Sequence, residues 1–415
     1  MTSEKSYSLD QYFLQYPPQK QDYSLKAIEN RLDELGGFHK DLKVIHVAGT
    51  NGKGSVCAYL TSILNKAHYS VGTYTSPHLL NIKERIQIDR QMLSDDEWWS
   101  AVEKYQSYFQ GLSYFEVLTF LSFILFKQRN VDFVVLETGM GGRLDATNVC
   151  HPLLSVITNV DYDHMGHLGN TLEKIAFEKM GIIKKDAPVV SGLTQEPLQN
   201  RLREKAYSLN SPSYLLHKDF QYEFSALKYP HKNQFVFYGE EKKTFEDLNI
   251  WNFFLFENLS LVLKCVEVLR EEGILISEEA LEEGVRDFKW PARMEIIQKK
   301  PLILFDVAHN PHAFHCLKKS LLSFFDWDHI YFLLGIVRDK EWSQMIDIIQ
   351  TLNPIMGVAS FESQRSWDVH DIKNVEFKFS SMKEGFDFFK DKLTESDLLC
   401  VTGSLYSVSE VKKYV

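Results

Sequence analysis

One short segment constrains the fold of this chain more than any other: the glycine-rich run V-A-G-T-N-G-K-G-S from Val47 to Ser55. It follows an apolar, strand-like run from Leu42 to Ala48 and precedes a segment with the apolar spacing of a helix. A glycine-rich turn between a strand and a helix N-terminus directs successive backbone N–H groups at one point, where the helix dipole also favours an anion. Lys53 adds a positive charge for the terminal phosphates. The segment therefore predicts a nucleoside triphosphate site.

The residue after the lysine departs from the common phosphate loop. That loop places Ser or Thr directly after the lysine, where the hydroxyl binds Mg²⁺, whereas this chain has Gly54 there. Ser55 substitutes for that hydroxyl only in part, so we expect a metal ligand from elsewhere in the chain. An ordinary glycine-rich turn is the alternative, but the flanking strand and helix are both of the kind that phosphate binding needs.

Segments with strand and helix patterns alternate along the first half of the chain. Val131 to Leu136 is apolar on both faces apart from one aspartate, which is typical of a parallel strand covered by helices. The alternation predicts a doubly wound α/β domain, in which ligands gather beyond the carboxyl ends of the strands. Four strand-like runs lead into Lys53, Ser76, Glu137 and His164, so we expect these side chains at one edge of a sheet. The runs are Leu42 to Ala48, Ser70 to Thr75, Val131 to Leu136 and Leu153 to Val160.

The second half of the chain divides into a β-rich segment, a helix and a second α/β pattern. Short alternating pieces between Tyr214 and Trp251 predict a β-hairpin elaboration. A helix is expected from Asn258 to Glu272, with Asn258 as a candidate N-cap. The W-P-A-R run at 290–293 interrupts the pattern, so we place the boundary there: residues 1–292 form a P-loop domain and residues 293–415 a smaller α/β domain. The strand-like runs of the smaller domain are Leu302 to Val307, Ile330 to Leu334 and Leu398 to Val401.

Composition and charge argue against several classes of protein. A net charge of −10 over 415 residues disfavours general nucleic-acid binding, which depends on Lys and Arg neutralising phosphates. The five cysteines are scattered and contain no C-x-x-C pair, so neither a disulfide framework nor a zinc site is expected. Met1 to Lys20 lacks the apolar core of a secretory signal. The longest apolar run, Val117 to Phe126, is about half of a membrane span and is typical of a buried helix. These features predict a cytoplasmic protein that acts without a membrane or a nucleic acid.

A series of motifs resembles folylpolyglutamate synthase/dihydrofolate synthase, a family of Mur-ligase-like enzymes. The motifs occur in family order from about residue 20 to the C-terminus. The resemblance implies an N-terminal P-loop ATPase domain joined to a C-terminal Rossmann-like domain that closes over ATP and glutamate. The motifs are G-T-N-G-K-G-S at 49–55, Y-T-S-P-H at 74–78, E-R-I at 84–86, G-G-R-L-D-A-T-N at 141–148, E-K-M-G-I-I-K at 178–184, W-P-A-R at 290–293, D-V-A-H-N-P at 306–311 and T-G-S-L-Y at 402–406.

The chemistry that the resemblance implies is ATP-dependent amide-bond formation between a pterin carboxylate and the amino group of L-glutamate. A carboxylate is unreactive toward amines because its leaving group would be oxide. Transfer of the γ-phosphoryl group gives an acyl phosphate, which the amine attacks with release of phosphate; catalysis of such a transfer is mostly positioning and charge neutralisation. The expected substrates are ATP, L-glutamate, dihydropteroate and folates. Members of the family are usually monomers, so a monomer is expected.

The resemblance also implies ligands for the phosphates and for two metal ions. Ser76 and Glu137 match Mg²⁺ ligands, and Ser76 supplies the hydroxyl that Gly54 lacks. His164 matches a ligand of the second ion. Mg²⁺ binds few carboxylates together with waters and phosphate oxygens, and imidazole is an unusual ligand for it, so Mn²⁺ is an alternative at the second site. The residues expected to bind the phosphates are Gly49, Thr50, Asn51, Gly52, Lys53, Gly54 and Ser55.

Other residues match groups that the family uses around ATP. Lys179 aligns with a lysine that can be carbamylated, which would turn a cation into an anion beside the metal; a simple helix-face cation is the alternative. Arg293, Asp306 and His309 resemble groups that close on ATP from the second domain, and Asn258 matches an asparagine near the adenine. The residues expected to act in catalysis are Lys53, Glu137, His164, Lys179 and Arg293.

Three residues are expected to contact the acceptor acid or glutamate. Asp145 lies in the L-D-A-T-N run, which resembles bifunctional bacterial members that accept dihydropteroate as well as folates; a turn aspartate is the alternative. Arg85 would pair with a substrate carboxylate, and a solvated surface arginine is the alternative. Ser404 would line the glutamate pocket.

Two rival functions make different predictions. A Mur ligase acting on a UDP-linked sugar carboxylate usually has Thr or Ser directly after the lysine, whereas this chain has Gly54. A P-loop switch or motor would release phosphate without an acyl acceptor, and it leaves the motif at 306–311 unexplained. Both features favour the folate ligase.

Overall fold

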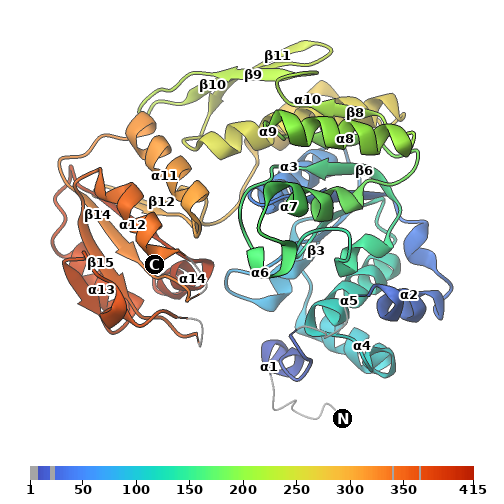
Figure 1. Cartoon of the computed structure of the whole chain (residues 1–415), viewed down its shortest axis with the longest axis horizontal. Helices are drawn as coiled ribbons and strands as arrows, with labels where there is room; N and C mark the ends of the chain where they lie inside the picture. The colour runs from blue at the N-terminus through green and yellow to red at the C-terminus, as the bar shows by residue number, and fades with distance from the viewer. Residues whose placement is uncertain (1–7, 19–23, 339–340, 364–365) are drawn as a thin grey trace. The chain divides into compact units, whose positions relative to one another are not determined.

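The computed structural model describes residues 8–18, 24–338, 341–363 and 366–415. The chain forms two compact units and passes between them more than once (Figure 1). The first unit comprises Met1–Tyr222, Phe237–Lys243 and Glu257–Phe288, and the second comprises Glu223–Val236, Thr244–Phe256 and Lys289–Val415. The domain boundary between residues 292 and 293 stays a prediction.

The first unit is built on an eight-stranded sheet with the order β4-β3-β2-β5-β1-β6-β7-β8. Six of the strands, from β2 to β8 in that order, run parallel, whereas β3 and β4 add an antiparallel edge. The predicted doubly wound α/β fold is confirmed, and the antiparallel edge is an addition that the sequence pattern did not indicate. The strands are β1 (Val44–Ala48), β2 (Val71–Tyr74), β3 (Ile86–Ile88), β4 (Gln91–Met92), β5 (Phe133–Glu137), β6 (Pro152–Ile157), β7 (Val189–Ser191) and β8 (Ser213–Leu215).

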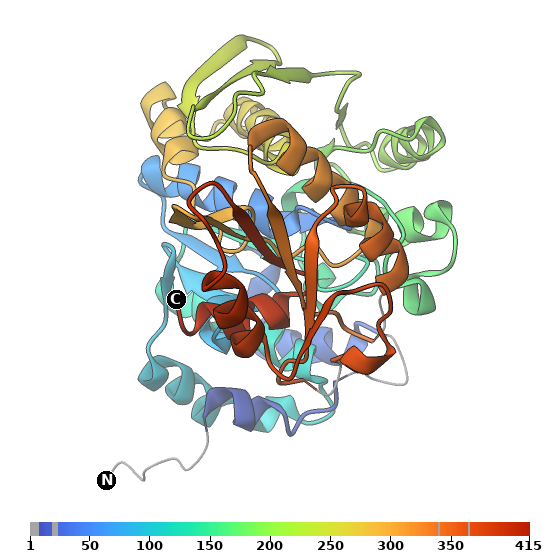
Figure 2. The same cartoon turned by 90° about the vertical axis from the view of Figure 1, so that its left-hand side faces the viewer.

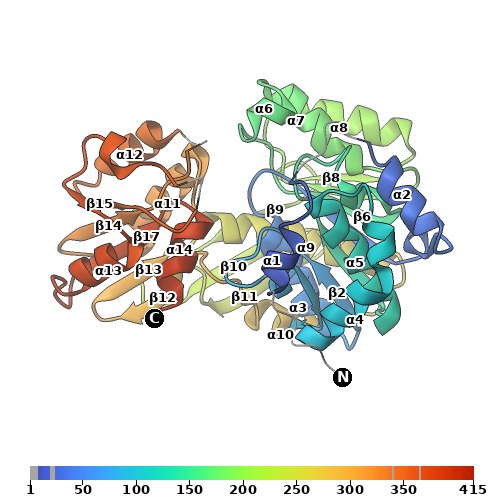
Figure 3. The same cartoon turned by 90° about the horizontal axis from the view of Figure 1, so that it is seen from below.

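Two helices cover opposite faces of this sheet, because side chains alternate along each strand. On β2, the Thr73 hydroxyl is hydrogen-bonded to the Thr61 hydroxyl of α3 (Lys53–Lys66) at 2.8 Å. The next residue, Tyr74, belongs to the core that contains α5 (Tyr114–Arg129). Helix α10 (Glu278–Arg286) packs along α3 (Figure 3). The sheet is therefore sandwiched between helical layers, as parallel strands with two apolar faces require.

Helix α5 shows how local sequence sets an element's limits. Ser113 and Glu116 form a reciprocal capping box at its start, and Asn130 ends it in the left-handed conformation. The apolar run between these signals is buried on all sides, which confirms the predicted buried helix. The other helices of the first unit are α1 (Leu9–Phe13), α2 (Lys26–Asp33), α4 (Asp95–Tyr105), α6 (Met165–Leu168), α7 (Leu172–Lys179) and α8 (Glu196–Ser208), with short 3₁₀ turns η1 (Phe38–Lys40), η2 (Ile82–Arg85), η3 (Gln106–Phe109), η4 (Ala146–Val149) and η5 (Met180–Ile182).

The predicted β elaboration is a three-stranded sheet with the order β11-β10-β9. Its strands are β9 (Gln221–Phe224), β10 (Asn233–Tyr238) and β11 (Lys242–Leu248), and helix α9 (Phe253–Glu271) follows them. Burial alternates along β10, with Phe235 and Phe237 buried, as expected of a strand with one face in a core.

The last part of the chain forms a six-stranded sheet with the order β12-β13-β17-β14-β15-β16. Of the strands that the structure describes in this sheet, only β12 runs antiparallel to its neighbour, and helices flank the sheet on both sides (Figure 2). The predicted second α/β domain is confirmed. Its elements are β12 (Glu295–Lys299), β13 (Leu302–Phe305), α11 (Pro311–Phe324), β14 (Ile330–Leu334), α12 (Trp342–Gln350), β15 (Ile355–Ala359), η6 (Val369–Asp371), β16 (Phe377–Phe379), α13 (Met382–Lys390), β17 (Leu398–Thr402) and α14 (Leu405–Lys412). Within the described ranges of the chain, no helix has the length and apolar character needed to cross a membrane.

Candidate functional site

The glycine-rich loop connects the end of β1 to the start of α3, as the sequence predicts. Gly52 precedes the helix with φ 87°, and Gly49 has φ 154°. A Cβ atom on Gly49 would overlap the Thr158 hydroxyl, and one on Gly52 would overlap the Asn258 amide. Both positions combine a left-handed φ with a close neighbour, so a side chain fits at neither.

A segment after β6 holds the loop in shape. Thr158 donates a hydrogen bond from its hydroxyl to the Asn51 carbonyl at 2.6 Å. The Asn159 side-chain oxygen accepts the Asn51 N–H at 2.9 Å, and its carbonyl accepts the Thr50 N–H at 3.0 Å. The Thr50 hydroxyl donates to the Asp161 carbonyl and accepts the Asp161 N–H. Sequence reasoning missed Thr158 and Asn159; the signal available was that they lie at the end of the strand-like run Leu153 to Val160, predicted to lie in the same sheet.

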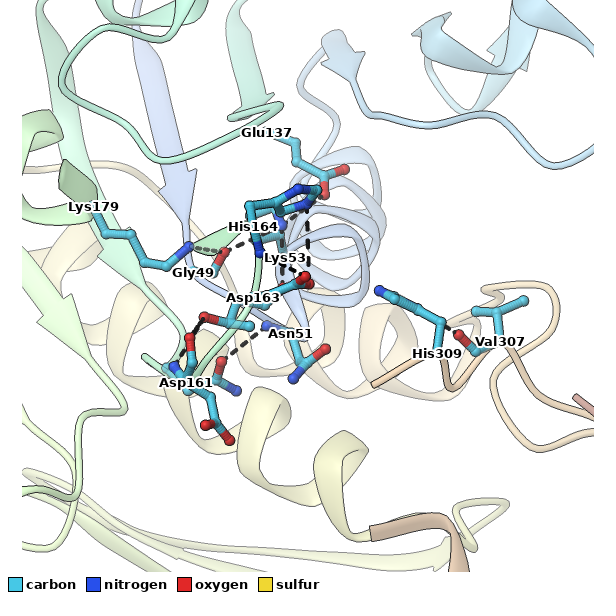
Figure 4. Close-up of polar contacts among 12 residues, drawn as sticks. Gly49, Asn51, Lys53, Glu137, Asp161, Asp163, His164, Lys179, Val307 and His309 are labelled. Carbon is cyan, nitrogen blue, oxygen red and sulfur yellow. Dashed lines mark hydrogen bonds and ion pairs between the residues drawn. The ribbon is translucent and has the colours of Figure 1, made fainter. Parts of the chain in front are cut away.

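Lys53 and Glu137 lie together at this edge of the sheet. The Lys53 ammonium donates to the Gly49 and Thr50 carbonyls at 3.2 and 3.4 Å and lies 3.9 Å from a Glu137 carboxylate oxygen (Figure 4). The other Glu137 oxygen accepts the Ser76 backbone N–H at 3.1 Å. Strands β1, β5 and β2 are neighbours, which brings the residues that follow them together, as predicted.

The donor groups of Glu137 and Ser76 suit a hard cation. Glu137 is 4% exposed, and its carboxylate lies beside a residue that carries a hydroxyl. Among the described residues, no group of three or more His, Cys, Asp and Glu side chains is arranged to hold a metal ion. One carboxylate and one hydroxyl leave most positions of an octahedral ion to water and phosphate oxygens, which is the coordination that Mg²⁺ prefers.

Lys179, at the end of α7, is buried against the glycine loop. Its ammonium donates to the Gly49 carbonyl at 2.8 Å, and the residue is 3% exposed. Burial, with repulsion from Lys53 as a smaller cause, lowers the pKa of Lys179 to about 7. Lys179 is therefore buried against the loop rather than on an exposed helix face, and its carbamylation stays a prediction. Near neutral pH a large fraction of this amine is uncharged and nucleophilic.

His164 lies in the loop that follows β6. It has φ 50° directly before α6, its ring nitrogen Nε2 lies 4.0 Å from an Asp163 carboxylate oxygen, and its side chain is 44% exposed. In Figure 4 the His164 ring points toward Lys53 and Glu137. The structure thus brings together Lys53, Ser76, Glu137, His164 and Lys179 around one loop.

Asn258 is not a helix N-cap. Helix α9 begins at Phe253, and Asn252 accepts the Phe254 N–H at 2.8 Å at that end. Asn258 lies inside the helix, is 2% exposed and faces Gly52 of the loop. The predicted start of the helix was wrong because the F-F-L-F run at 253–256 lacks the usual signals of a helix interior. In the first turn of α3, Gly54 and Ser55 are buried.

Arg85 is buried rather than solvated. Its Nε–H donates to His78 Nδ1 at 2.9 Å, and its guanidinium lies 5.4 Å from the centre of the Tyr114 ring. Since His78 accepts at Nδ1, its Nε2 carries the proton and faces an Asp10 oxygen at 3.6 Å. Burial, followed by the Arg85 charge, lowers the pKa of His78 to about 4, so the ring is neutral. Through His78, Arg85 thus connects the segment after Ser76 with Asp10 of α1.

Asp145 forms the turn that the alternative interpretation described. One of its carboxylate oxygens accepts the Met140 N–H at 2.8 Å, and the other accepts the Thr147 N–H at 3.1 Å and the Thr147 hydroxyl at 2.6 Å. Burial raises the pKa of Asp145, and these hydrogen bonds oppose the rise. This structural role does not exclude contact with a substrate, whose binding by Asp145 stays a prediction.

Four predicted site residues lie in the second unit. Asp306 follows β13, is 5% exposed and accepts the Met294 and Ala308 N–H groups at 3.0 and 2.8 Å. Burial raises the pKa of Asp306, and the nearby Arg293 opposes the rise. His309 donates from Nδ1 to the Val307 carbonyl at 2.9 Å. Ser404 caps α14 by accepting the Ser407 N–H at 3.0 Å.

Comparison with known proteins places this architecture in a family. Residues 47–228 match the Mur ligase middle domain, and residues 292–405 match the Mur ligase glutamate ligase domain. The chain is 35% identical over 407 residues to the dihydrofolate synthase/folylpolyglutamate synthase of Bacillus subtilis, with 94% of each protein covered. It is 29% identical over 410 residues to that of Escherichia coli, with 95% of this chain and 92% of the other covered.

Solved structures are similar over nearly the whole chain. The structure of E. coli FolC in complex with DHPP and ADP aligns with a TM-score of 0.88 at 28% identity, covering 99% of this chain and 98% of the other. The Mycobacterium tuberculosis folylpolyglutamate synthase complexed with ADP and AMPPCP aligns with a TM-score of 0.88 at 25% identity, covering 98% and 97%. The chain belongs to the dihydrofolate synthase/folylpolyglutamate synthase family of Mur-type ligases.

Proposed function

We propose that this chain uses ATP to join L-glutamate to dihydropteroate and to folates through an acyl phosphate, releasing ADP and phosphate. The observation that carries the proposal is the convergence of Lys53, Ser76, Glu137 and Lys179 on one glycine-rich loop at the carboxyl edge of a parallel sheet. The relatives that the chain matches in sequence over 92% or more of their length carry both activity names. The binding of ADP and DHPP described for E. coli FolC supports the same substrates here.

The glycine loop supplies the phosphate-binding part of the reaction. Its N–H groups precede α3, so the helix dipole adds to their attraction for the β- and γ-phosphates. Lys53 would turn from the Gly49 and Thr50 carbonyls to the terminal phosphates, a small movement for a flexible side chain. Asn258, which lies against Gly52, supports adenine binding near the loop.

Glu137 and Ser76 would hold Mg²⁺, and His164 a second ion that is either Mg²⁺ or Mn²⁺. When bound there, the ion would supply positive charge that offsets the charge of the phosphates. The Lys53 ammonium lies 3.9 Å from a Glu137 carboxylate oxygen, which supports a proposal that both groups act on the same phosphates. Lys53 then opposes the charge that develops on the transferred group.

Lys179 is a candidate for carbamylation. The uncharged amine is the form that attacks carbon dioxide, and a pKa of about 7 makes that form abundant. The resulting carbamate would replace a buried cation beside Lys53 with an anion, so the pair would attract instead of repel.

The acceptor and glutamate sites are assigned to Asp145, Arg85 and Ser404. Arg85 keeps a fixed guanidinium through His78 and Tyr114, which suits pairing with a substrate carboxylate. We assign Arg293, Asp306 and His309 to ATP from the second unit, and we propose a monomeric, cytoplasmic enzyme with small-molecule substrates and no nucleic-acid partner.

A panel of acceptor acids tests the proposal. Purified protein is incubated with ATP, Mg²⁺ and L-glutamate and with dihydropteroate, tetrahydrofolate or a UDP-linked sugar acid, and ADP and the amide product are measured together. Dihydrofolate from dihydropteroate and longer glutamate chains on tetrahydrofolate are the expected products. Phosphate release that no pterin stimulates, or a product from the UDP-linked acid alone, would refute the assignment.

A further inference from the structure

A chain of buried hydrogen bonds connects the strand of the glycine loop with Asp145. Thr147 Oγ1 lies 2.6 Å from Asp145 Oδ1, His46 Nε2 lies 2.8 Å from Thr147 Oγ1, and Cys150 Sγ lies 3.7 Å from His46 Nδ1. All four residues are 7% exposed or less, and His46 and Thr147 are fully buried. The reaction described above uses only Asp145 of the four.

The direction of each bond follows from the number of protons available. An ionised Asp145 can only accept, so the single Thr147 hydroxyl proton points to it. His46 Nε2 must then donate to the Thr147 oxygen, which leaves His46 Nδ1 bare to accept the Cys150 S–H. Burial, followed by the charge of Lys184, lowers the pKa of His46 to about 3, so the ring holds only this one proton. In each of these hydrogen bonds, the donor therefore points along the chain of bonds toward Asp145.

The position of His46 in β1 connects this chain of hydrogen bonds to the glycine loop. His46 is in β1, the strand that continues into the glycine loop at Gly49. In the sheet it pairs with Leu136 of β5, next to Glu137, and with Ser155 of β6. Thr147 belongs to η4, the turn that Asp145 caps. The His46–Thr147 bond therefore joins the strand that positions the phosphates to the turn that presents Asp145.

We infer that Thr147 and His46 are positioning residues that hold the Asp145 carboxylate in the orientation that the acceptor acid requires. The inference rests on the proposed role of Asp145 toward that substrate. A buried carboxylate with donors on both oxygens cannot rotate without losing a hydrogen bond. The Thr147 hydroxyl is the shortest of these contacts, and His46 in turn fixes the rotamer of Thr147. The Asp145 carboxylate is therefore already oriented when the acceptor acid binds. We expect ATP binding not to depend on the His46–Thr147–Asp145 hydrogen bonds.

The test compares steady-state kinetics of variants in the intact enzyme, with KM measured separately for dihydropteroate and for ATP. Thr147→Val keeps the shape of the side chain and removes the hydroxyl's hydrogen bonds to Asp145 and from His46, while the Thr147 N–H still donates to Asp145. We expect the KM for dihydropteroate to rise roughly tenfold or more, as loss of a hydrogen bond to a charged group implies, with the KM for ATP and kcat changed less than about threefold. Thr147→Ser, which restores the hydroxyl, should return the KM to the wild-type value.

Ser155→Ala is the matched control. Ser155 pairs with His46 in the sheet, is fully buried and donates to the Ile182 carbonyl at 3.0 Å, so its loss disturbs the same layer without touching Asp145. It should lower the thermal midpoint and leave the KM for dihydropteroate unchanged. A rise in that KM equal to the rise in Thr147→Val would show a general packing effect and overturn the inference.

Asp145→Asn separates the inference from the function on which it rests. If Asp145→Asn leaves the KM for dihydropteroate unchanged, the proposed role of Asp145 fails. If Asp145→Asn raises it and Thr147→Val does not, the positioning role fails while the function stands. The nitrogen resonances of His46, assigned by their absence from His46→Gln, give a readout on wild-type protein that does not depend on Thr147→Val folding. A proton on Nε2 and a bare Nδ1 are expected, and the opposite tautomer would overturn the inference.

Discussion

Replacement of Lys179 by methionine tests whether a buried cation lies beside the glycine loop. The folded protein lowers the pKa of Lys179 from 10.5 to about 7, and each pKa unit corresponds to ~1.4 kcal/mol. The charged side chain therefore destabilises the fold by about 4–5 kcal/mol below pH 7. Methionine removes this penalty, and it also loses the hydrogen bond to Gly49, which contributes about 1 kcal/mol. Lys179→Met should be more stable than the wild type by roughly 3 kcal/mol near pH 7, while it loses activity.

The pH dependence of that difference is the sharper measurement. Between pH 7 and about 10, the unfolded chain keeps a proton on Lys179 that the folded chain has released, so the stability of the wild type rises with pH. The advantage of Lys179→Met should then shrink across this range and vanish near pH 10. Thermal unfolding in buffers free of carbon dioxide measures it, with an expected shift of about 5 °C at pH 7. Lys185→Met, at a site that is 76% exposed, is the control and should shift little.

Two results would refute this reasoning. A stability difference that stays constant from pH 7 to pH 10 would mean that Lys179 does not titrate in this range. A variant less stable than the wild type at pH 7 would mean that the ammonium is compensated by partners beyond Gly49. Addition of bicarbonate provides a second check, because a carbamylated Lys179 should stabilise only the wild type.

The remaining predictions concern residues at the loop. Lys53→Ala and Glu137→Ala should each abolish turnover in the ADP-release assay, while circular dichroism shows an intact fold; more than a few per cent of residual activity would remove that residue from the mechanism. Gly49→Ala forces a Cβ into the Thr158 hydroxyl, so ATP-dependent turnover should fall by at least a hundredfold. The double variant with Thr158→Ala makes room for the Cβ and should recover part of that loss, and no recovery would show that the backbone conformation of Gly49 is the decisive factor.

Sequence patterns predicted the parts of the fold that depend on regular alternation. A strand with two apolar faces, such as β5, and a helix with clear capping signals, such as α5, can be predicted from the local sequence alone. The start of α9 was missed because residues 253–256 give no helix signal; the burial of Leu255 and Phe256 depends on tertiary packing that the local sequence does not show. The antiparallel edge of β3 and β4 was missed because strands of two or three residues are too short to show a period.

The part of the candidate site that could be predicted consists of polar residues that directly follow strands of the same sheet. Lys53, Ser76 and Glu137 each follow a strand, so topology alone predicts that they meet. Thr158 and Asn159 act through their contacts with Asn51, and such contacts depend on register between β1 and β6, which a single sequence does not reveal. Burial of Lys179 was equally hidden, since its neighbours in the helix are partly polar and its partner Gly49 is 130 positions away in the chain.

Strand β1 connects the glycine loop with the turn of Asp145 through one rigid element. It has parallel neighbours on both sides, so its backbone is fixed by two hydrogen-bonded ladders. Its end carries the glycine loop, and its buried His46 donates to the turn of Asp145. Because both contacts come from one strand, the glycine loop and the turn of Asp145 are fixed relative to each other without an additional hinge or loop between them. If the loop binds the phosphates and Asp145 binds the acceptor acid, as proposed, the reacting groups would lose little entropy on reaction, because a single strand preorganises both.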